Sequence, residues 1–213
     1  MWRSVGAALA LSLALADSAA AAAWGCYGTK PGHPTAAERE AFIREVSALA
    51  VKAERAHGVP ASALAAMAIA ESGYGWTRLA LEANNLFAWK YVRSAAGGRR
   101  SYVSECQRGR IRRDRFVVFA SRADAVDFVA ARLATADAYR EPTNAYKAAR
   151  KRGEAAEPAA KAWLSAVASR YSRKPAEFTK KIIRIMNNPA APGDAVSPDV
   201  NLYRLSAGAG TPR

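Results

Sequence analysis

A short apolar helix that ends at a glutamate is the feature that most constrains this chain. Four residues share one helix face by their spacing: Leu64, Met67, Ala68 and Glu71. Gly73 follows at once, so Glu71 is expected in the last helical turn. Burial and the negative end of the helix dipole both raise the pKa of a carboxyl group. A carboxyl that stays protonated near neutral pH can act as a general acid, and Glu71 is therefore a candidate catalytic residue.

The alternative is that Glu71 is an ordinary last helical residue that turns toward solvent. The following residues favour the catalytic interpretation, because the stretch ESGYGWTRLALEANNLFAWK resembles the signature of the glycoside hydrolase family 73 peptidoglycan N-acetylglucosaminidases. Tyr74 replaces the usual Trp of that signature, and Ala88 replaces a usual Gly. The matching residues are Glu71, Ser72, Gly73, Gly75, Leu79, Ala80, Asn84, Asn85, Leu86, Phe87 and Lys90.

The resemblance covers residues 35–188 and implies a mainly α fold. We expect a lysozyme-like helical domain with a small β-hairpin lobe, at about residues 91–119, across an active-site cleft. It further implies hydrolysis of the β-1,4 bond between N-acetylglucosamine and N-acetylmuramic acid in peptidoglycan, with Glu71 as general acid. A muramidase or lytic transglycosylase of the same fold, or a non-catalytic wall-binding protein, are the alternatives.

The same resemblance implies two further catalytic residues. Glu105 would be a base for water or would stabilise an oxocarbenium-like charge, although Cys106 departs from the usual aromatic beside it. Tyr171 would orient the substrate or the water, with a core tyrosine as the alternative. Direct attack by water, a nucleophilic carboxylate and the substrate's own 2-acetamido group all remain open for the step after protonation.

Aromatic and amide side chains around the signature are candidates for sugar binding, and at least half of the aromatic ones are expected to be core residues. The two asparagines are also expected to shape a turn. These substrate-binding candidates are Trp76, Asn84, Asn85, Phe87, Trp89 and Tyr91.

The first 23 residues have the pattern of a secretory signal peptide. Arg3 precedes an apolar run that is too short to span a bilayer, and small residues precede Trp24. We therefore expect a periplasmic or extracellular protein without a stable membrane anchor, a retained anchor being the alternative.

The net charge of +14 would favour nucleic acid as a partner in many proteins. An exported protein rarely meets nucleic acid, so we expect peptidoglycan strands and an anionic wall polymer instead. Residues 91–115 supply a basic hairpin for that polymer, and an ordinary solvated surface is the alternative. Its arginines are Arg93, Arg99, Arg100, Arg108, Arg110, Arg112, Arg113 and Arg115.

The chain has two cysteines, Cys26 and Cys106. In an oxidising compartment they could form one disulfide, and a lipidated Cys26 is the minor alternative. His33 and His57 have no ligand-like spacing to the cysteines. We therefore expect no bound metal. We also expect no cofactor and a monomeric protein.

Local signals predict the remaining elements. Residues 24–34 are expected to form an extended lead-in, and capping-box patterns begin helices at Thr35 and Ser121, the second ending near Tyr139. Further helices are expected between Pro142 and Gly153 and at 159–169, and a last helix that holds Phe178 is expected to stop at Asn187. Residues 189–213 are rich in Ala, Pro and Gly and are expected to form a mobile tail.

Overall fold

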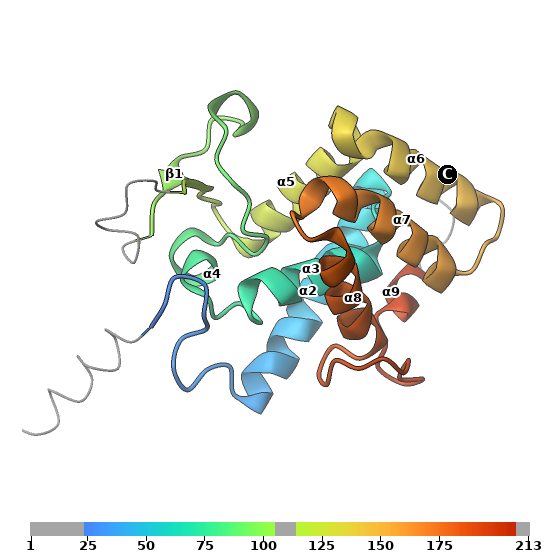
Figure 1. The fold of residues 1–213 in the computed structure, drawn as a ribbon, viewed down its shortest axis with the longest axis horizontal. Coiled ribbons are helices and arrows are strands. Elements are labelled where there is room, and N and C mark those ends of the chain that lie inside the picture. The colour runs from blue at the N-terminus through green and yellow to red at the C-terminus, as the bar shows by residue number, and fades with distance from the viewer. Residues whose placement is uncertain (1–23, 105–113, 208–213) are drawn as a thin grey trace, which may run out of the picture.

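Helix α3 (Ala61–Ser72) lies at the centre of the computed structural model, which describes residues 24–104 and 114–207 (Figure 1). Ten of its twelve residues are buried, so the helix is covered on all sides and not only on the one face that its spacing predicted. Alanine dominates α3, and small side chains on every face let neighbouring helices approach closely. Those neighbours are α2 (Ala36–His57), α5 (Arg122–Thr135), α7 (Ala156–Tyr171), α8 (Pro175–Asn187) and α9 (Tyr203–Ala207).

The predicted start of α2 is confirmed by its capping box. The Thr35 hydroxyl accepts from the Glu38 amide, and the Glu38 carboxylate accepts from the Thr35 amide at 2.8 Å. The helix ends at Gly58, whose backbone is left-handed with φ of 73°. Its apolar stripe packs on α3 and α5, so local capping signals placed this helix correctly.

The helices after Ser121 begin and end at residues that differ from the predicted ones. Ser121 caps α5 as expected, but α5 ends at Thr135 rather than near Tyr139. Ala136 has an extended backbone with ψ of 139°, which breaks the helix and lets α6 (Asp137–Lys151) begin at once. The helix predicted beyond Pro142 therefore starts five residues before it, and α7 is longer than predicted at both ends.

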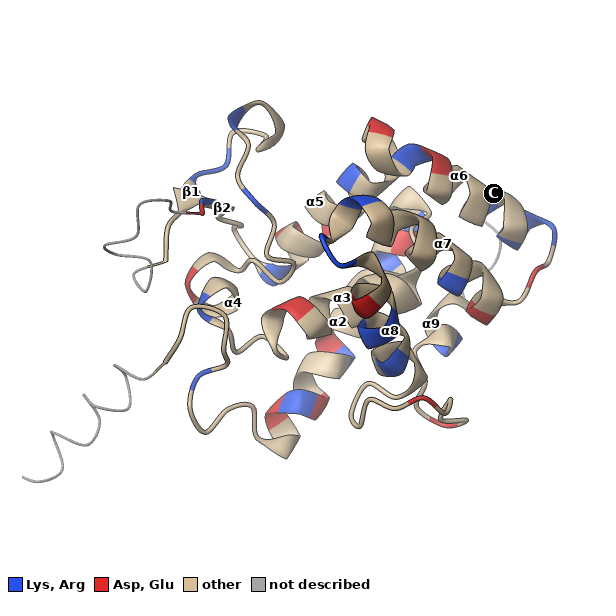
Figure 2. Ribbon diagram, in the orientation of Figure 1, with Lys and Arg blue, Asp and Glu red and all other residues tan. Residues whose placement is uncertain are grey.

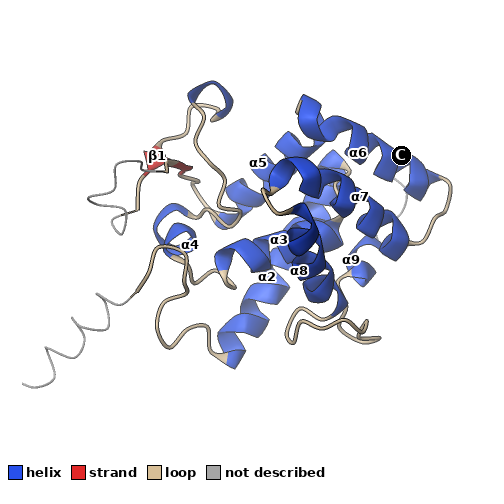
Figure 3. Cartoon of the chain, in the orientation of Figure 1, coloured by secondary structure: helices blue, strands red, loops and turns tan. Residues whose placement is uncertain are grey.

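The β lobe consists of short elements at one side of the helical bundle, as Figure 3 shows. Strand β1 (Ser101–Tyr102) pairs antiparallel with β2 (Phe116–Val117), with Tyr102 opposite Phe116. Helix α4 (Arg78–Ala83) and the 3₁₀ turn η1 (Arg93–Ala95) complete this side. The mainly α fold with a small hairpin lobe is thus confirmed, whereas residues 105–113, between the two strands, lie outside the described residues.

The predicted mobile tail is wrong for residues 190–207, which pack against the helical bundle. Leu202 and Tyr203 are buried, and the Leu202 amide donates to the Met186 carbonyl at 2.8 Å. The Asn187 side chain holds the connecting loop by donating to the carbonyls of Gly193 and Asp194. Two apolar residues and one buried amide thus anchor a segment whose composition resembles that of a linker.

The lead-in of residues 24–34 is anchored to the loop that follows α3. Thr29 forms an isolated antiparallel bridge with Thr77, and the Lys30 amide donates to the Trp76 carbonyl at 2.9 Å. Cys26 is disulfide-bonded, while Cys106 lies outside the described residues. Among the helices in the described ranges, none combines the length and the apolar character needed to cross a bilayer.

Candidate active site

The corner after α3 fixes the position of Glu71. Ser72 donates its hydroxyl to the Ala68 carbonyl at 2.6 Å and accepts from the Gly75 amide at 2.8 Å. Gly73 has φ of 56°, and a Cβ atom there would lie 2.3 Å from the Thr29 side chain. Only glycine fits this turn, so α3 ends at Ser72, one residue after Glu71.

Glu71 lies in a partly closed environment, with 25% of its side chain exposed. Burial raises the pKa of the Glu71 carboxyl above its ordinary value. The ammonium of Lys181, 3.9 Å from the carboxylate, opposes this shift without cancelling it. A carboxyl with a raised pKa can supply a proton, which is the chemistry that the sequence predicted for this residue.

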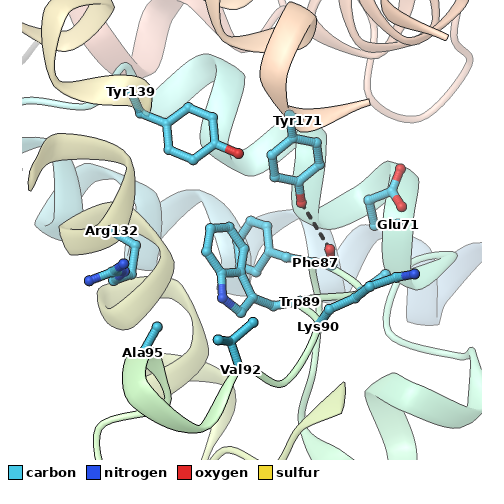
Figure 4. Close-up of a pocket in the computed structure, with 10 residues that line it drawn as sticks. Glu71, Phe87, Trp89, Lys90, Val92, Ala95, Arg132, Tyr139 and Tyr171 are labelled. Atoms are coloured by element: carbon cyan, nitrogen blue, oxygen red, sulfur yellow. Dashed lines mark hydrogen bonds between the residues drawn. The ribbon is translucent and has the colours of Figure 1, made fainter. Parts of the chain in front are cut away.

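A pocket of about 410 Å³ opens beside Glu71 (Figure 4). Its floor is the loop after α4, and its other walls come from η1, the α5–α6 junction and the end of α7. The lining residues are Glu71, Phe87, Ala88, Trp89, Lys90, Val92, Ala95, Arg132, Tyr139 and Tyr171. Glu71 is the one carboxylate among these described residues, so a second carboxylate would have to come from elsewhere.

Tyr171 lines the same pocket as Glu71. Its hydroxyl donates to the Phe87 carbonyl at 2.8 Å, which the dashed line in Figure 4 marks. Burial, followed by the nearby Glu71 charge, raises the pKa of Tyr171 well above its ordinary value. Tyr171 therefore stays neutral, and its hydroxyl oxygen keeps lone pairs that can accept a hydrogen bond.

Trp89 forms the middle of the pocket wall. Its ring lies edge-on to Phe128 with centroids 6.3 Å apart, and is tilted to Tyr171 at 6.2 Å. Ala88 beside it has φ of 49°, the backbone conformation for which the family signature uses glycine. Phe87 lines the pocket but is 99% covered, so it acts chiefly as a core residue.

The structure does not bring the other four substrate-binding candidates into this pocket. Trp76 stacks on His33 with centroids 3.9 Å apart, and Tyr91 lies under the Arg115 guanidinium. Asn84 occupies a left-handed turn and donates to the Phe119 carbonyl. Asn84 thus shapes a turn, the role that the sequence also predicted for it.

Asn85 has a similar structural role and is fully buried. Its amide nitrogen donates to the carbonyls of Trp89 and Val117, and its oxygen accepts from the Trp89 amide at 2.8 Å. The side chain therefore fastens the pocket floor to β2. A substrate cannot reach it in this arrangement.

The basic hairpin is only partly free to meet a polymer. Arg99 forms an ion pair with Asp124 at 2.5 Å, and Arg115 stacks on Tyr91. Arg93 and Arg100 are exposed. Figure 2 shows basic residues on the segment before β1 and on α8. The remaining hairpin arginines, Arg108, Arg110, Arg112 and Arg113, lie outside the described residues, as does Glu105.

Sequence reasoning missed the pocket residues that come from the α5–α6 junction. Arg132 and Tyr139 follow no motif, and they reach the pocket because Ala136 breaks the helix between them. No sequence pattern indicated that Val92 and Ala95 would line the pocket either. Lys181 was missed because it lies 110 residues from Glu71 in the sequence.

No cluster of three metal-ligating side chains occurs within residues 24–104 and 114–207.

Comparisons with known proteins place the chain among related sequences. A protein-family model described as mannosyl-glycoprotein endo-β-N-acetylglucosaminidase matches residues 47–190. The catalytic domain of the autolysin Auto from Listeria monocytogenes has a similar structure, with a TM-score of 0.54 and 19% identity. The match covers 94% of this chain and 99% of that one. No curated protein sequence matches the chain.

Proposed function

The chain belongs to the glucosaminidase family and is a glycoside hydrolase, and from this premise we propose that it cleaves peptidoglycan between N-acetylglucosamine and N-acetylmuramic acid. The observation that carries the proposal is the carboxyl of Glu71, which lies in a pocket and has a pKa raised by burial. The similar structure from Listeria is named an autolysin, which supports a cell-wall substrate.

In this proposal Glu71 protonates the glycosidic oxygen as the bond to the leaving sugar breaks. Proton transfer of this kind contributes a factor of about 10²–10⁴ to the rate. Trp89 supplies an apolar surface on which a sugar ring can stack, at the centre of the pocket. Tyr171 orients the substrate or the water through the free lone pairs of its hydroxyl oxygen.

The second step has three candidate routes, and two of them need another carboxylate. We assign that role to Glu105 on the resemblance alone. Water activated by Glu105 would invert the anomeric configuration, whereas a covalent intermediate would retain it. The 2-acetamido group of the substrate is the third route, and it needs Glu71 as the acid and no protein nucleophile.

We further propose that residues 1–23 are a cleaved signal peptide and that the mature protein acts in the periplasm or outside the cell. The apolar run beginning at Val5 and the small residues before Trp24 support this. Recovery of a mature protein that begins near Trp24 from the extracytoplasmic fraction would test it. A full-length chain retained in the cytoplasm would contradict it.

Digestion of purified peptidoglycan tests the activity. The wild type should release fragments that end in reduced N-acetylglucosamine after borohydride treatment, and Glu71→Gln should release none. Glu177→Gln, which removes an exposed carboxylate on α8 outside the pocket, should cleave like the wild type.

The fragment ends also separate the alternatives. Reduced N-acetylmuramic acid would identify a muramidase, and anhydro-muramic ends would identify a lytic transglycosylase. Binding to the wall by both wild type and Glu71→Gln, without any cleavage, would identify a binding protein.

A further inference from the structure

Arg132 is a pocket cation without a partner. It lies in the last turn of α5, lines the same pocket as Glu71, and is partly buried. Its guanidinium has no hydrogen bond and no ion pair with any residue in the described part of the chain. Neighbouring arginines are different, because Arg99 binds Asp124 and Arg122 binds Glu45 at 2.7 Å.

The other charges in and beside the pocket are already compensated. Lys90 forms an ion pair with Asp114 at 2.9 Å, and Lys181 lies next to the Glu71 carboxylate. Arg132 is therefore the lining cation that still lacks an acceptor among the described residues. A partly covered guanidinium loses hydration, and a ligand carboxylate can restore its hydrogen bonds in a bidentate geometry.

The position of Arg132 relative to Glu71 indicates which chemical groups a ligand of this pocket would carry. In Figure 4, Arg132 and Glu71 lie at opposite ends of the pocket, with Trp89 between them. A sugar stacked on Trp89 could thus place a glycosidic oxygen near Glu71 and an acidic substituent near Arg132. A neutral sugar could offer the guanidinium hydroxyl or amide oxygens, but it would leave the positive charge without an anionic partner.

Tyr139 adds a second donor at the upper wall of the pocket. Its hydroxyl has no hydrogen-bond partner among residues 24–104 and 114–207, and burial raises the pKa of Tyr139. The hydroxyl therefore keeps its proton at neutral pH and can donate it to an anionic oxygen. Arg132 and Tyr139 come from the two sides of the α5–α6 break.

We propose that Arg132, together with the Tyr139 hydroxyl, binds the carboxylate of an N-acetylmuramic acid residue next to the cleaved bond. The inference rests on the proposed function, since it takes the glycan strand as the occupant of the pocket. It adds a specificity element, because the lactyl carboxylate distinguishes muramic acid from N-acetylglucosamine.

A binding experiment tests the inference without relying on turnover. Glu71→Gln protein is titrated calorimetrically with a soluble tetrasaccharide of alternating N-acetylglucosamine and N-acetylmuramic acid with free carboxylates. The same tetrasaccharide with its carboxylates converted to methylamides is the matched ligand. Adding Arg132→Gln should weaken binding of the carboxylate ligand by about 10–100-fold, the effect of losing a charged hydrogen-bonded pair. Affinity for the methylamide should not change.

Three variants control for charge and folding. Arg140→Gln removes an arginine that lies on α6 outside the pocket and is paired with Asp137, and it should leave both affinities unchanged. Arg132→Lys keeps the charge but loses the bidentate geometry, so its affinity for the carboxylate ligand should be intermediate. Tyr139→Phe should weaken binding of the carboxylate ligand less than Arg132→Gln does.

Each outcome decides the inference. The inference would be overturned if Arg132→Gln lost the same affinity for both ligands or lost none for either. It would also be overturned if Glu71→Gln bound neither ligand. Cleavage by the wild type is measured separately on whole peptidoglycan. A protein that cleaves but shows no carboxylate preference keeps the proposed function and loses the inference. A protein that binds through Arg132 but never cleaves loses the hydrolase function and keeps the carboxylate site.

Discussion

A carboxylate oxygen of Glu71 lies 3.9 Å from the ammonium of Lys181, which α8 carries to the end of α3. The two residues influence the proton on Glu71 in opposite directions. Burial of the Glu71 carboxyl raises its pKa, and the positive charge of Lys181 lowers it. The burial effect is the larger, so the net pKa is raised.

Replacement of Lys181 should therefore shift the pH dependence of catalysis. Lys181→Met removes the charge that favours ionised Glu71, so the pKa of Glu71 should rise further. The general acid must be protonated, and the alkaline limb of the kcat/KM profile should move to higher pH. Lys180→Met, which removes the neighbouring charge on the same helix, is the matched control. An unchanged alkaline limb in Lys181→Met would contradict this assignment.

The raised pKa also predicts a cost to stability. The folded state holds the Glu71 proton more tightly than the unfolded state, so stability falls as pH rises through the folded pKa. Glu71→Gln removes this cost and should raise Tm at pH 7. The difference should disappear below pH 4.5, the ordinary pKa of the carboxyl. The same Tm difference at pH 4 and pH 7 would exclude ionisation as its cause.

Asn85 should contribute to stability rather than to substrate binding. Asn85→Ala removes the buried side chain that donates to the carbonyls of Trp89 and Val117 and accepts from the Trp89 amide, so the free energy of unfolding should fall by about 2–4 kcal/mol. Asn84→Gly keeps the left-handed turn and removes one hydrogen bond, so it should cost only about 0.5–1.5 kcal/mol. Urea unfolding measures both. If both variants lost the same stability, the buried amide would not be the anchor of the pocket floor.

Ala88→Gly should stabilise the pocket floor slightly. A left-handed backbone costs an L-residue about 1–2 kcal/mol, and glycine loses about 0.5–1 kcal/mol through its greater freedom in the unfolded chain. The net gain at Ala88, with φ of 49°, should be up to about 1.5 kcal/mol in the free energy of unfolding. Ala95→Gly, in the η1 turn of the same pocket, should instead destabilise. A loss of stability in Ala88→Gly would mean that the methyl group makes contacts that outweigh the strain.

Many local features could be predicted because their causes lie within a few residues. The capping box at Thr35, the Ser121 hydroxyl at the start of α5 and the glycine after Ser72 fix three helix ends through hydrogen bonds to near neighbours. The break at Ala136 was not predicted, because no glycine or proline marks it. The tail was mispredicted because it has few large apolar residues, and the burial of Leu202 and Tyr203 depends on packing against helices that lie far away in the sequence, since α9 contacts α2, α3 and α7.

The sequence by itself determined that a glutamate lies in the last turn of an apolar helix and that a tight glycine corner and an asparagine turn follow it. These properties depend on side-chain spacing and backbone conformation over about one helical turn. Only the tertiary structure decided which side chains meet Glu71. Tyr171 and Lys181 reach it from α7 and α8, and Arg132 reaches the far end of the pocket from α5. Such contacts depend on how helices distant in the chain pack against α3, and the burial produced by that packing raises the pKa of Glu71.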